Sequence, residues 1–265
     1  MAVLEVTNDG HVRTLRLNRP EKKNALSEEL AWGIITAVGE AAKDDEVWII
    51  AIRGTDDAFC SGLDLTGGDE GFERPLTEQE AYLDDLGWVS RFPLALREWC
   101  DKPVVAGLNG VAVGAGLALA MAADIRIAAE SVRLIAGYPR IGGSPDAGLS
   151  WTLPQAIGYE QAMRFLLENR TVGAEEALAL GMVGEIVPDE QFDARFDEYC
   201  QSLTKLSPIT GRLTKRVVRR ATALPDAEAH MRYEVASITR AFGSEDGKEA
   251  RQAFLERREP RFKGR

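Results

Sequence analysis

Two glycine turns in this sequence are suited to present backbone N–H groups to one bound ligand. One turn contains Gly62 and leads into Leu63; the other contains Gly114 and leads into Ala115. Each is expected to follow a strand and to precede a helix, and the first N–H groups of a helix have no carbonyl partner within it. Such groups can hold a phosphate, and two that converge on a carbonyl oxygen can polarise it and stabilise an enolate. The alternative is that both are ordinary strand-to-helix turns.

Asp146 is the candidate side chain for proton transfer or nucleophilic attack. It lies in a turn rich in glycine and proline, residues 139–148. A carboxylate in a partly apolar pocket can have its pKa raised toward the range in which a base works. The alternative is that Asp146 caps the helix expected over residues 149–157. Asp64 and Asp124 have similar alternatives, as cap and turn residues.

Composition excludes several classes of function. The 265 residues are 45% hydrophobic and 28% charged, as in a globular protein, and the net charge of −10 argues against a nucleic-acid surface. The three cysteines have no metal-ligand spacing, and the only histidines, His11 and His230, are far apart. We therefore expect no metal site and no histidine-dependent triad. No signal-peptide pattern or apolar run of about 18 residues is present, which predicts a cytoplasmic protein without membrane contact.

The elements that must position these residues alternate between strands and helices. A hairpin is expected over residues 4–17, and Ser27 can cap the helix that follows. The next expected elements are strand 47–53, helix 77–99, strand 103–108, helix 117–123 and strand 125–129. This order predicts right-handed crossovers and a largely parallel sheet. Beyond it we expect helices over 149–157, 159–168 and 174–180, a strand over 183–187, and only helices from residue 191, with breaks at 207–208 and 224–225.

A basic cluster marks the C-terminal part of the chain. It consists of Arg212, Lys215, Arg216, Arg219 and Arg220. Because these residues follow both spacings of a helix surface, they predict a face that is solvated or contacts another subunit.

Several segments together resemble the enoyl-CoA hydratase/isomerase (crotonase) superfamily. Residues 19–26, RPEKKNAL, resemble its early loop, and residues 58–65 and 109–117 resemble its two oxyanion-hole segments. Residues 174–188 resemble the helix and strand that follow, and residues 262–264 resemble its closing residues. The motifs occur in order at the family's spacing and cover nearly the whole chain.

The resemblance implies a fold and a class of substrate. The fold is α/β, a spiral of ββα repeats over residues 1–205. A C-terminal helical region, residues 206–265, would make trimer contacts and close the site, in a homotrimer or a dimer of trimers. The substrate would be an acyl-CoA thioester, so that coenzyme A enters with the substrate and no other cofactor is needed. The thioester oxygen would lie between the N–H groups of Leu63 and Ala115.

The resemblance also assigns residues that would contact the coenzyme A or acyl parts of the substrate. They are Lys22, Lys23, Asn24, Ala25, Leu26, Ala58, Ser61, Gly62, Asp64, Leu65, Gly114, Tyr138, Phe262 and Lys263. The loop at residues 66–75 and the helix after it would shape the acyl pocket.

Departures from the family pattern favour an isomerase. A hydratase of the family type has two glutamates, and the matching positions here are Ala118 and Tyr138. Asp146 is placed as in single-aspartate enoyl-CoA isomerases, where one carboxylate moves a proton between the α and γ carbons while the oxyanion hole holds the dienolate. Three alternatives stay open: a hydratase using Asp146 alone, an enzyme similar to 4-chlorobenzoyl-CoA dehalogenases with Asp146 as nucleophile, and a pseudoenzyme that binds acyl-CoA. The dehalogenase alternative lacks its histidine, whose position falls near Arg91.

Overall fold

The protein contains two β-sheets, and after the N-terminal hairpin successive pairs of strands along the chain contribute one strand to each. The computed structural model describes residues 2–66, 71–223, 231, 235–236 and 239–265. Six strands pair in the order β1-β2-β3-β5-β7-β10, and four strands pair in the order β4-β6-β8-β9. The bounds of the larger sheet are β1 Leu4–Asp9, β2 Val12–Leu17, β3 Ile49–Gly54, β5 Val104–Leu108, β7 Ile125–Ala129 and β10 Glu185–Val187. Those of the smaller sheet are β4 Ala58–Cys60, β6 Val111–Val113, β8 Arg133–Ile135 and β9 Thr171–Val172.

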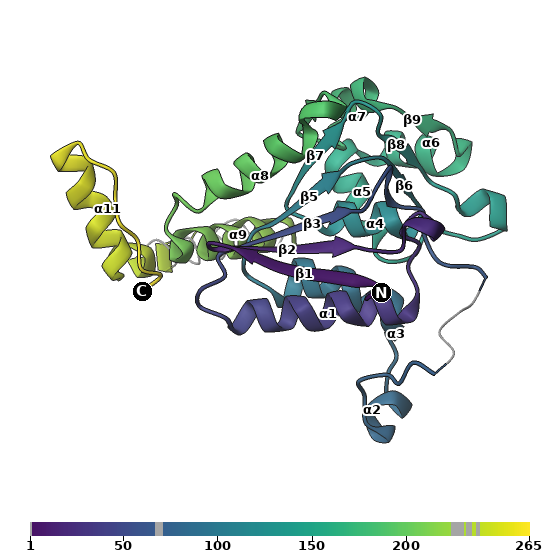
Figure 1. The fold of residues 1–265 in the computed structure, drawn as a ribbon, viewed down its shortest axis with the longest axis horizontal. Coiled ribbons are helices and arrows are strands. Elements are labelled where there is room, and N and C mark those ends of the chain that lie inside the picture. Colours follow the sequence, from purple (N-terminus) through teal and green to yellow (C-terminus); the bar gives the residue numbers. More distant parts are fainter. Residues whose placement is uncertain (1, 67–70, 224–230, 232–234, 237–238) are drawn as a thin grey trace.

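Each repeat gives one strand to each sheet, which confirms the expected spiral (Figure 1). The pairs β3/β4, β5/β6 and β7/β8 follow one another along the chain, and all neighbours among these strands are parallel. Antiparallel pairing is confined to the hairpin β1–β2 and to β8–β9. Strand β3 is buried along its whole length, so both of its faces are apolar and its sequence shows no alternation. The sequence predicted the larger sheet but missed the smaller one, whose strands have only two or three residues each.

Helices cover both faces of the larger sheet. On one face lie α1 Glu28–Lys43, α3 Gly87–Leu94, α4 Ala115–Ala122 and α5 Leu149–Ile157, whose apolar side chains join the main core. On the other face α8 Phe192–Leu203 packs Phe192 and Phe196 against the strands. The predicted cap of α1 is confirmed, because the Ser27 hydroxyl accepts the Leu30 N–H at 3.2 Å. Helices α6 Tyr159–Glu168 and α7 Ala174–Leu180 also match their expected ranges.

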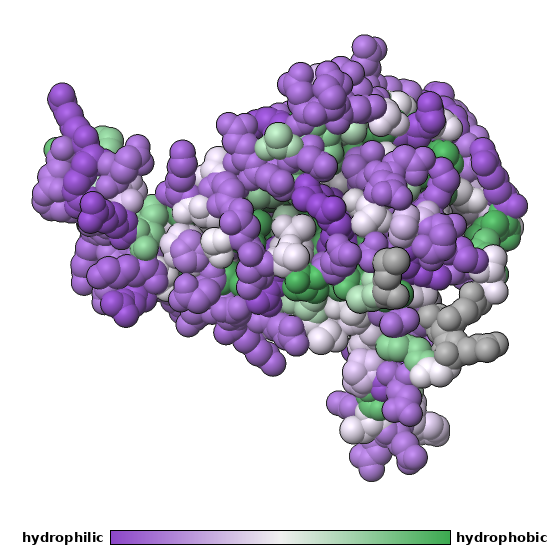
Figure 2. Space-filling model, in the orientation of Figure 1, coloured by the Kyte–Doolittle hydropathy of each residue, from purple (hydrophilic) through white to green (hydrophobic). Residues whose placement is uncertain are grey.

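The single helix expected over residues 77–99 is instead three pieces. They are α2 Glu78–Tyr82, α3 and a π-helical turn, Ala95–Trp99. The Asp84 carboxylate accepts the N–H groups of Leu86 and Gly87, which offers the backbone an alternative to the helix. Pro93 inside α3 removes a further helical hydrogen bond. Helix α2 consequently projects from the body of the molecule (Figure 1), and Figure 2 shows some hydrophobic colour on this projection. Tyr82, in α2, and Leu83, which follows it, are exposed.

Helix α9, Pro208–Ala223, runs along the amino ends of the parallel strands. The basic cluster on it is mostly not a solvated face, contrary to expectation. Lys215 is buried and donates to the carbonyls of Leu96 and Lys102 and to the Asp124 carboxylate at 2.8 Å. Arg216 likewise binds the Asp101 carboxylate, and Arg219 binds that of Glu98. These contacts fix α9 to the spiral, a role that helical spacing alone could not show.

The last described helix is α11, Glu245–Glu256, which lies away from β6 in Figure 1. The break expected at residues 224–225 falls outside the described residues. Within the described part of the chain, no helix combines the length and the apolar character that crossing a membrane requires.

Candidate active site

A cavity of about 320 Å³ lies where the Gly62 turn meets the start of α4. Its lining brings together eight of the residues that the sequence singled out: Ser61, Gly62, Leu63, Leu65, Gly114, Ala115, Tyr138 and Asp146. The other lining residues are Val113, Ile135, Gly137, Arg140, Ile141, Gly143 and Ser144. Asp146 is the only carboxylate in this lining.

The two glycine turns converge, as one of the two sequence interpretations held. Among the described residues, neither the Leu63 N–H nor the Ala115 N–H donates to a protein acceptor. Gly62 has a φ of 101°, which an L-residue rarely adopts, and this conformation turns the chain just before Leu63. Both donors therefore remain available to a ligand oxygen in the cavity.

Gly116 sets how closely the two turns approach. A Cβ atom at this position would lie 2.3 Å from the Cys60 carbonyl oxygen, so only glycine lets the first turn of α4 rest on the end of β4. The separation of the two donors is thus fixed by backbone packing, independently of any side chain that faces the ligand.

The early loop is joined to the Gly62 turn by backbone hydrogen bonds. Leu26 N–H donates to the Gly62 carbonyl at 2.7 Å, and Asp64 N–H donates to the Leu26 carbonyl at 2.9 Å. These bonds form an isolated parallel bridge between Leu26 and Leu63. A Ser61 N–H bond to the Lys23 carbonyl extends the connection. The loop and the Leu63 donor therefore form one unit.

A partly buried ion pair secures the same unit. The Arg19 guanidinium donates to the Asp64 carboxylate at 2.7 Å and to the Ala25 carbonyl at 2.6 Å. The side chains of Arg19 and Asp64 are 12% and 5% exposed. Hydrogen bonds from the Thr66 hydroxyl and from Arg19 lower the pKa of Asp64 from 3.8 to about 2. Asp64 acts here as an anchor and is absent from the cavity wall.

This ion pair predicts a specific pH dependence of stability. Because the pKa of Asp64 is lower in the folded chain, its charged form stabilises the fold above about pH 4, and that contribution disappears as the pH falls through about 2. We expect wild type to exceed Asp64→Asn in free energy of unfolding by a constant amount above about pH 5, and the difference to shrink below about pH 4. Urea unfolding over a pH series measures it. A difference that does not depend on pH would contradict the assignment.

Asp146 is held by Tyr138 and does not cap a helix. The Tyr138 hydroxyl donates to the Asp146 Oδ1 at 2.9 Å. Helix α5 has Gly148 as its N-cap without a side-chain hydrogen bond, so the alternative in which Asp146 caps this helix is wrong. Burial and the neighbouring carboxylate raise the pKa of Tyr138 well above its usual value, so its hydroxyl remains a donor. The carboxylate is thereby oriented with its second oxygen left for other contacts.

Two positions that bear on the type of reaction carry no side chain that can act as a base. Ala118 lies in α4, is buried, and presents only a methyl group. Arg91 is bound to Asp84 at 2.7 Å, and its guanidinium lies over the Trp32 ring. Arginine keeps its proton in proteins, so Arg91 cannot serve as a base.

Several expected contact residues lie outside the cavity wall. The Asn24 side chain is fully buried and donates to the Thr55 and Ala58 carbonyls, so it stabilises the conformation of the loop. Ala58 itself is buried in β4. Lys22 bonds the Thr66 hydroxyl, and Lys23 lies 3.3 Å from Asp57. The Ala25 and Leu26 side chains are buried as well. Lys22 and Lys23 are exposed at the loop surface.

Phe262 and Lys263 are not brought to the cavity of their own chain. Phe262 packs against the cluster that contains Trp48 and Phe196. The Lys263 N–H donates to Asp246 in α11 at 2.7 Å. This segment belongs to the C-terminal end of the molecule, away from β6 (Figure 1).

Sequence reasoning missed Arg140 and Ser144 in the cavity wall. Both belong to the glycine- and proline-rich turn from which only Asp146 had been selected. The signal available was the turn itself, because a short segment that brings one residue to a site also brings its neighbours.

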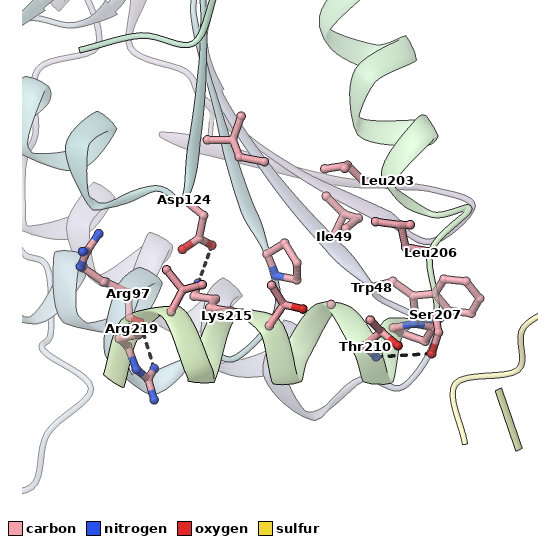
Figure 3. A pocket seen from close by; sticks show the side chains of 16 residues that line it. Trp48, Ile49, Arg97, Asp124, Leu203, Leu206, Ser207, Thr210, Lys215 and Arg219 are labelled. Carbon is pink, nitrogen blue, oxygen red and sulfur yellow. Dashed lines mark hydrogen bonds and ion pairs between the residues drawn. The ribbon is translucent and has the colours of Figure 1, made fainter. Parts of the chain in front are cut away.

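A second cavity, of about 410 Å³, lies between α9 and the amino ends of the strands (Figure 3). Trp48, Ile49, Leu203 and Leu206 give it an apolar wall, with Arg97 and Arg219 toward the opposite side. Its buried amino group, that of Lys215, is bound to Asp124 and to two carbonyls. Neither Lys215 nor Asp124 is therefore free to act as an acid or base there, in contrast to Asp146.

Known proteins resemble this chain over nearly its whole length. The family model described as enoyl-CoA hydratase/isomerase matches residues 7–265. A probable enoyl-CoA hydratase of Rhodobacter capsulatus is 35% identical over 252 residues, which are 95% of this chain and 94% of that protein. The 1,2-epoxyphenylacetyl-CoA isomerase of Escherichia coli is 32% identical over 259 residues, 96% of this chain and 95% of that protein. The crystal structure of an enoyl-CoA hydratase from Bacillus anthracis has a TM-score of 0.89 at 27% identity, and covers 99% of this chain and 100% of that chain.

Proposed function

The chain belongs to the enoyl-CoA hydratase/isomerase family, and we propose that it is an isomerase that shifts a carbon–carbon double bond of an enoyl-CoA. The observation that carries the proposal is that one carboxylate, Asp146, shares a cavity with two unpaired backbone donors. One carboxylate suffices for a proton transfer that begins and ends on the substrate.

In the proposed complex, the thioester oxygen accepts the N–H groups of Leu63 and Ala115. Polarisation of the carbonyl acidifies the α carbon, and in a β,γ-unsaturated thioester the dienolate spreads its charge onto this oxygen. The hydrogen bonds from these donors are stronger when charge has developed on the oxygen than in the ground state. They therefore lower the activation barrier. They need no rearrangement, because Gly116 packing already sets their separation.

Asp146 would carry the proton between the two carbons. Its carboxylate removes the α proton, and the electron pair of that C–H bond forms the new α,β double bond through the dienolate. The resulting carboxylic acid returns the proton to the γ carbon, so the enzyme ends in its starting state and no co-reactant is consumed. The Tyr138 hydrogen bond leaves one carboxylate oxygen for this transfer.

Water addition and aryl dehalogenation find less support in the cavity. The lining contains no second carboxylate that could activate a water molecule. The residues at the two glutamate positions of hydratases are Tyr138, whose raised pKa keeps its hydroxyl protonated, and Ala118, which is buried outside the lining. Activation of water on an aryl ester needs a base beside the nucleophile. At the corresponding position Arg91 is bound to Asp84.

The direct test incubates the purified protein with 3-hexenoyl-CoA and follows the appearance of the conjugated thioester absorbance. A parallel reaction with 2-hexenoyl-CoA measures the loss of that absorbance through hydration. We expect conjugation of the 3-enoyl substrate to be much faster than hydration of the 2-enoyl substrate. Faster hydration would instead support a hydratase, and tight acyl-CoA binding without turnover of a substrate panel would support a pseudoenzyme.

We also propose that the C-terminal region forms a homotrimer or a dimer of trimers. Apolar side chains on it are exposed in the single chain, including Val218, Phe242 and Phe254, the last of them 82% exposed. Large exposed apolar groups of this kind mark contact surfaces. We expect light scattering to give three or six times the chain mass of 29.0 kDa. A monomeric mass at micromolar concentration would contradict this proposal.

A further inference from the structure

The cavity contains one cationic side chain that double-bond transfer does not use. Arg140 lies on a 3-10 turn, Tyr138–Ile141, and lines the same cavity as the oxyanion donors and Asp146. Two hydrogen bonds fix the start of this turn. The Gly137 N–H donates to the Asn169 side chain at 2.7 Å, and Tyr138 is bound to Asp146. The base of the Arg140 side chain is therefore held in place.

The Arg140 guanidinium has no protein partner among the described residues. Its backbone N–H bonds the Gly137 carbonyl, but no ion pair or hydrogen bond involves the side chain, and the residue is exposed. Most other arginines of the described chain do have partners, as Arg19, Arg53 and Arg91 illustrate. Arg140 is thus available to an anion that enters the cavity.

The remaining lining indicates where such an anion would lie. Arg140 and Asp146 are the only charged residues of the wall, and Leu65, Val113, Ile135 and Ile141 make much of the rest apolar. An anionic group on the ligand is repelled by Asp146 and attracted by Arg140. An apolar spacer between the thioester and that anion would fit the apolar wall.

We propose that Arg140 binds a carboxylate at the far end of the acyl group, so that the substrate is a coenzyme A monothioester of an unsaturated dicarboxylic acid. The planar guanidinium matches a carboxylate through two parallel hydrogen bonds. The diphosphate of coenzyme A is a poorer candidate, because the pantetheine arm separates it from the thioester held by Leu63 and Ala115. This inference rests on the proposed function for the placement of the thioester.

The test compares binding of two saturated thioesters that cannot undergo double-bond transfer. Glutaryl-CoA carries a terminal carboxylate, and pentanoyl-CoA has the same chain length without it. Calorimetry on the oligomer as purified should show that wild type binds glutaryl-CoA about tenfold more tightly than pentanoyl-CoA. Arg140→Met should remove this preference and leave pentanoyl-CoA binding within about twofold. Arg140→Lys should retain part of it.

Arg133→Met is the matched control, because Arg133 is an exposed arginine in β8 outside the cavity lining. It should bind both thioesters as wild type does. Equal binding of the two thioesters by wild type, or equal weakening of both by Arg140→Met, would overturn the inference. Since binding does not require turnover, a carboxylate preference without isomerisation would count against the proposed function alone.

Discussion

Asp146→Asn is expected to lower the rate of double-bond transfer by about 10³-fold while leaving the affinity for saturated acyl-CoA within about twofold. Asparagine keeps the shape of the side chain and can still accept the Tyr138 hydroxyl, but it cannot take up a proton. General acid–base catalysis contributes about 10²–10⁴-fold, and here one group would perform both transfers. Initial rates of conjugation, with calorimetric binding of butyryl-CoA, measure the two quantities.

Tyr138→Phe is the graded comparison for Asp146→Asn. It leaves the carboxylate in place and removes only its orienting hydrogen bond. We expect kcat to fall about tenfold with little change in KM, since orientation contributes less than the proton transfer itself. If Asp146→Asn retained activity within tenfold of wild type, another group would have to carry the proton.

Ala115→Pro is expected to reduce kcat by about 10²–10³-fold, because proline has no N–H and the substitution deletes one oxyanion donor. Ala115 is the first residue of α4, a position that proline accommodates well in helices. The preceding residue is Gly114, whose missing Cβ reduces the clash with the proline ring. The fold should persist, which circular dichroism and thermal unfolding can verify.

The control is Ala174→Pro, which makes the same substitution at the first position of α7. Gly173 before it has an extended backbone, which suits a following proline, and neither residue lines the cavity. This variant should retain near wild-type kcat. If both proline variants lost activity to the same degree, the loss would come from helix disruption, and the role of the Ala115 N–H would be refuted.

The sequence indicated that the site would contain backbone N–H donors and a carboxylate. It could not show how these groups are arranged in space. A glycine before a helix indicates unpaired N–H groups, and this holds for Ala115, the first residue of α4. Leu63 also lines the cavity, but no helix begins there, so the helix expected after Gly62 is wrong. Local spacing could not decide whether the two turns meet, because they lie about fifty residues apart. The decisive contact is that of Gly116 with the Cys60 carbonyl, which depends on tertiary packing.

The sequence left alternatives open where a polar residue could have two structural uses. Asp146 is a residue type that often caps helices, yet Gly148 caps α5 and Asp146 binds Tyr138. Lys215 has the spacing of an exposed helix face, yet it is buried against Asp124. Local propensity describes both uses equally well, so only the partner supplied by another part of the chain decides between them. The same reason explains why the Arg19–Asp64 ion pair went unnoticed.

The two oxyanion donors are backbone groups, whereas the other polar groups of the cavity that bear on the reaction are side chains. Substitutions can change the side chains but, in most cases, not the donors. A substitution at residue 63 or 115 changes a side chain but keeps the N–H, proline excepted, and Gly116 packing keeps the pair in register. Most point mutations would therefore leave intact the two N–H groups that activate a thioester. The fate of the activated intermediate depends instead on replaceable side chains, Tyr138, Arg140 and Asp146. A few substitutions on one short turn would suffice to turn this scaffold toward another reaction.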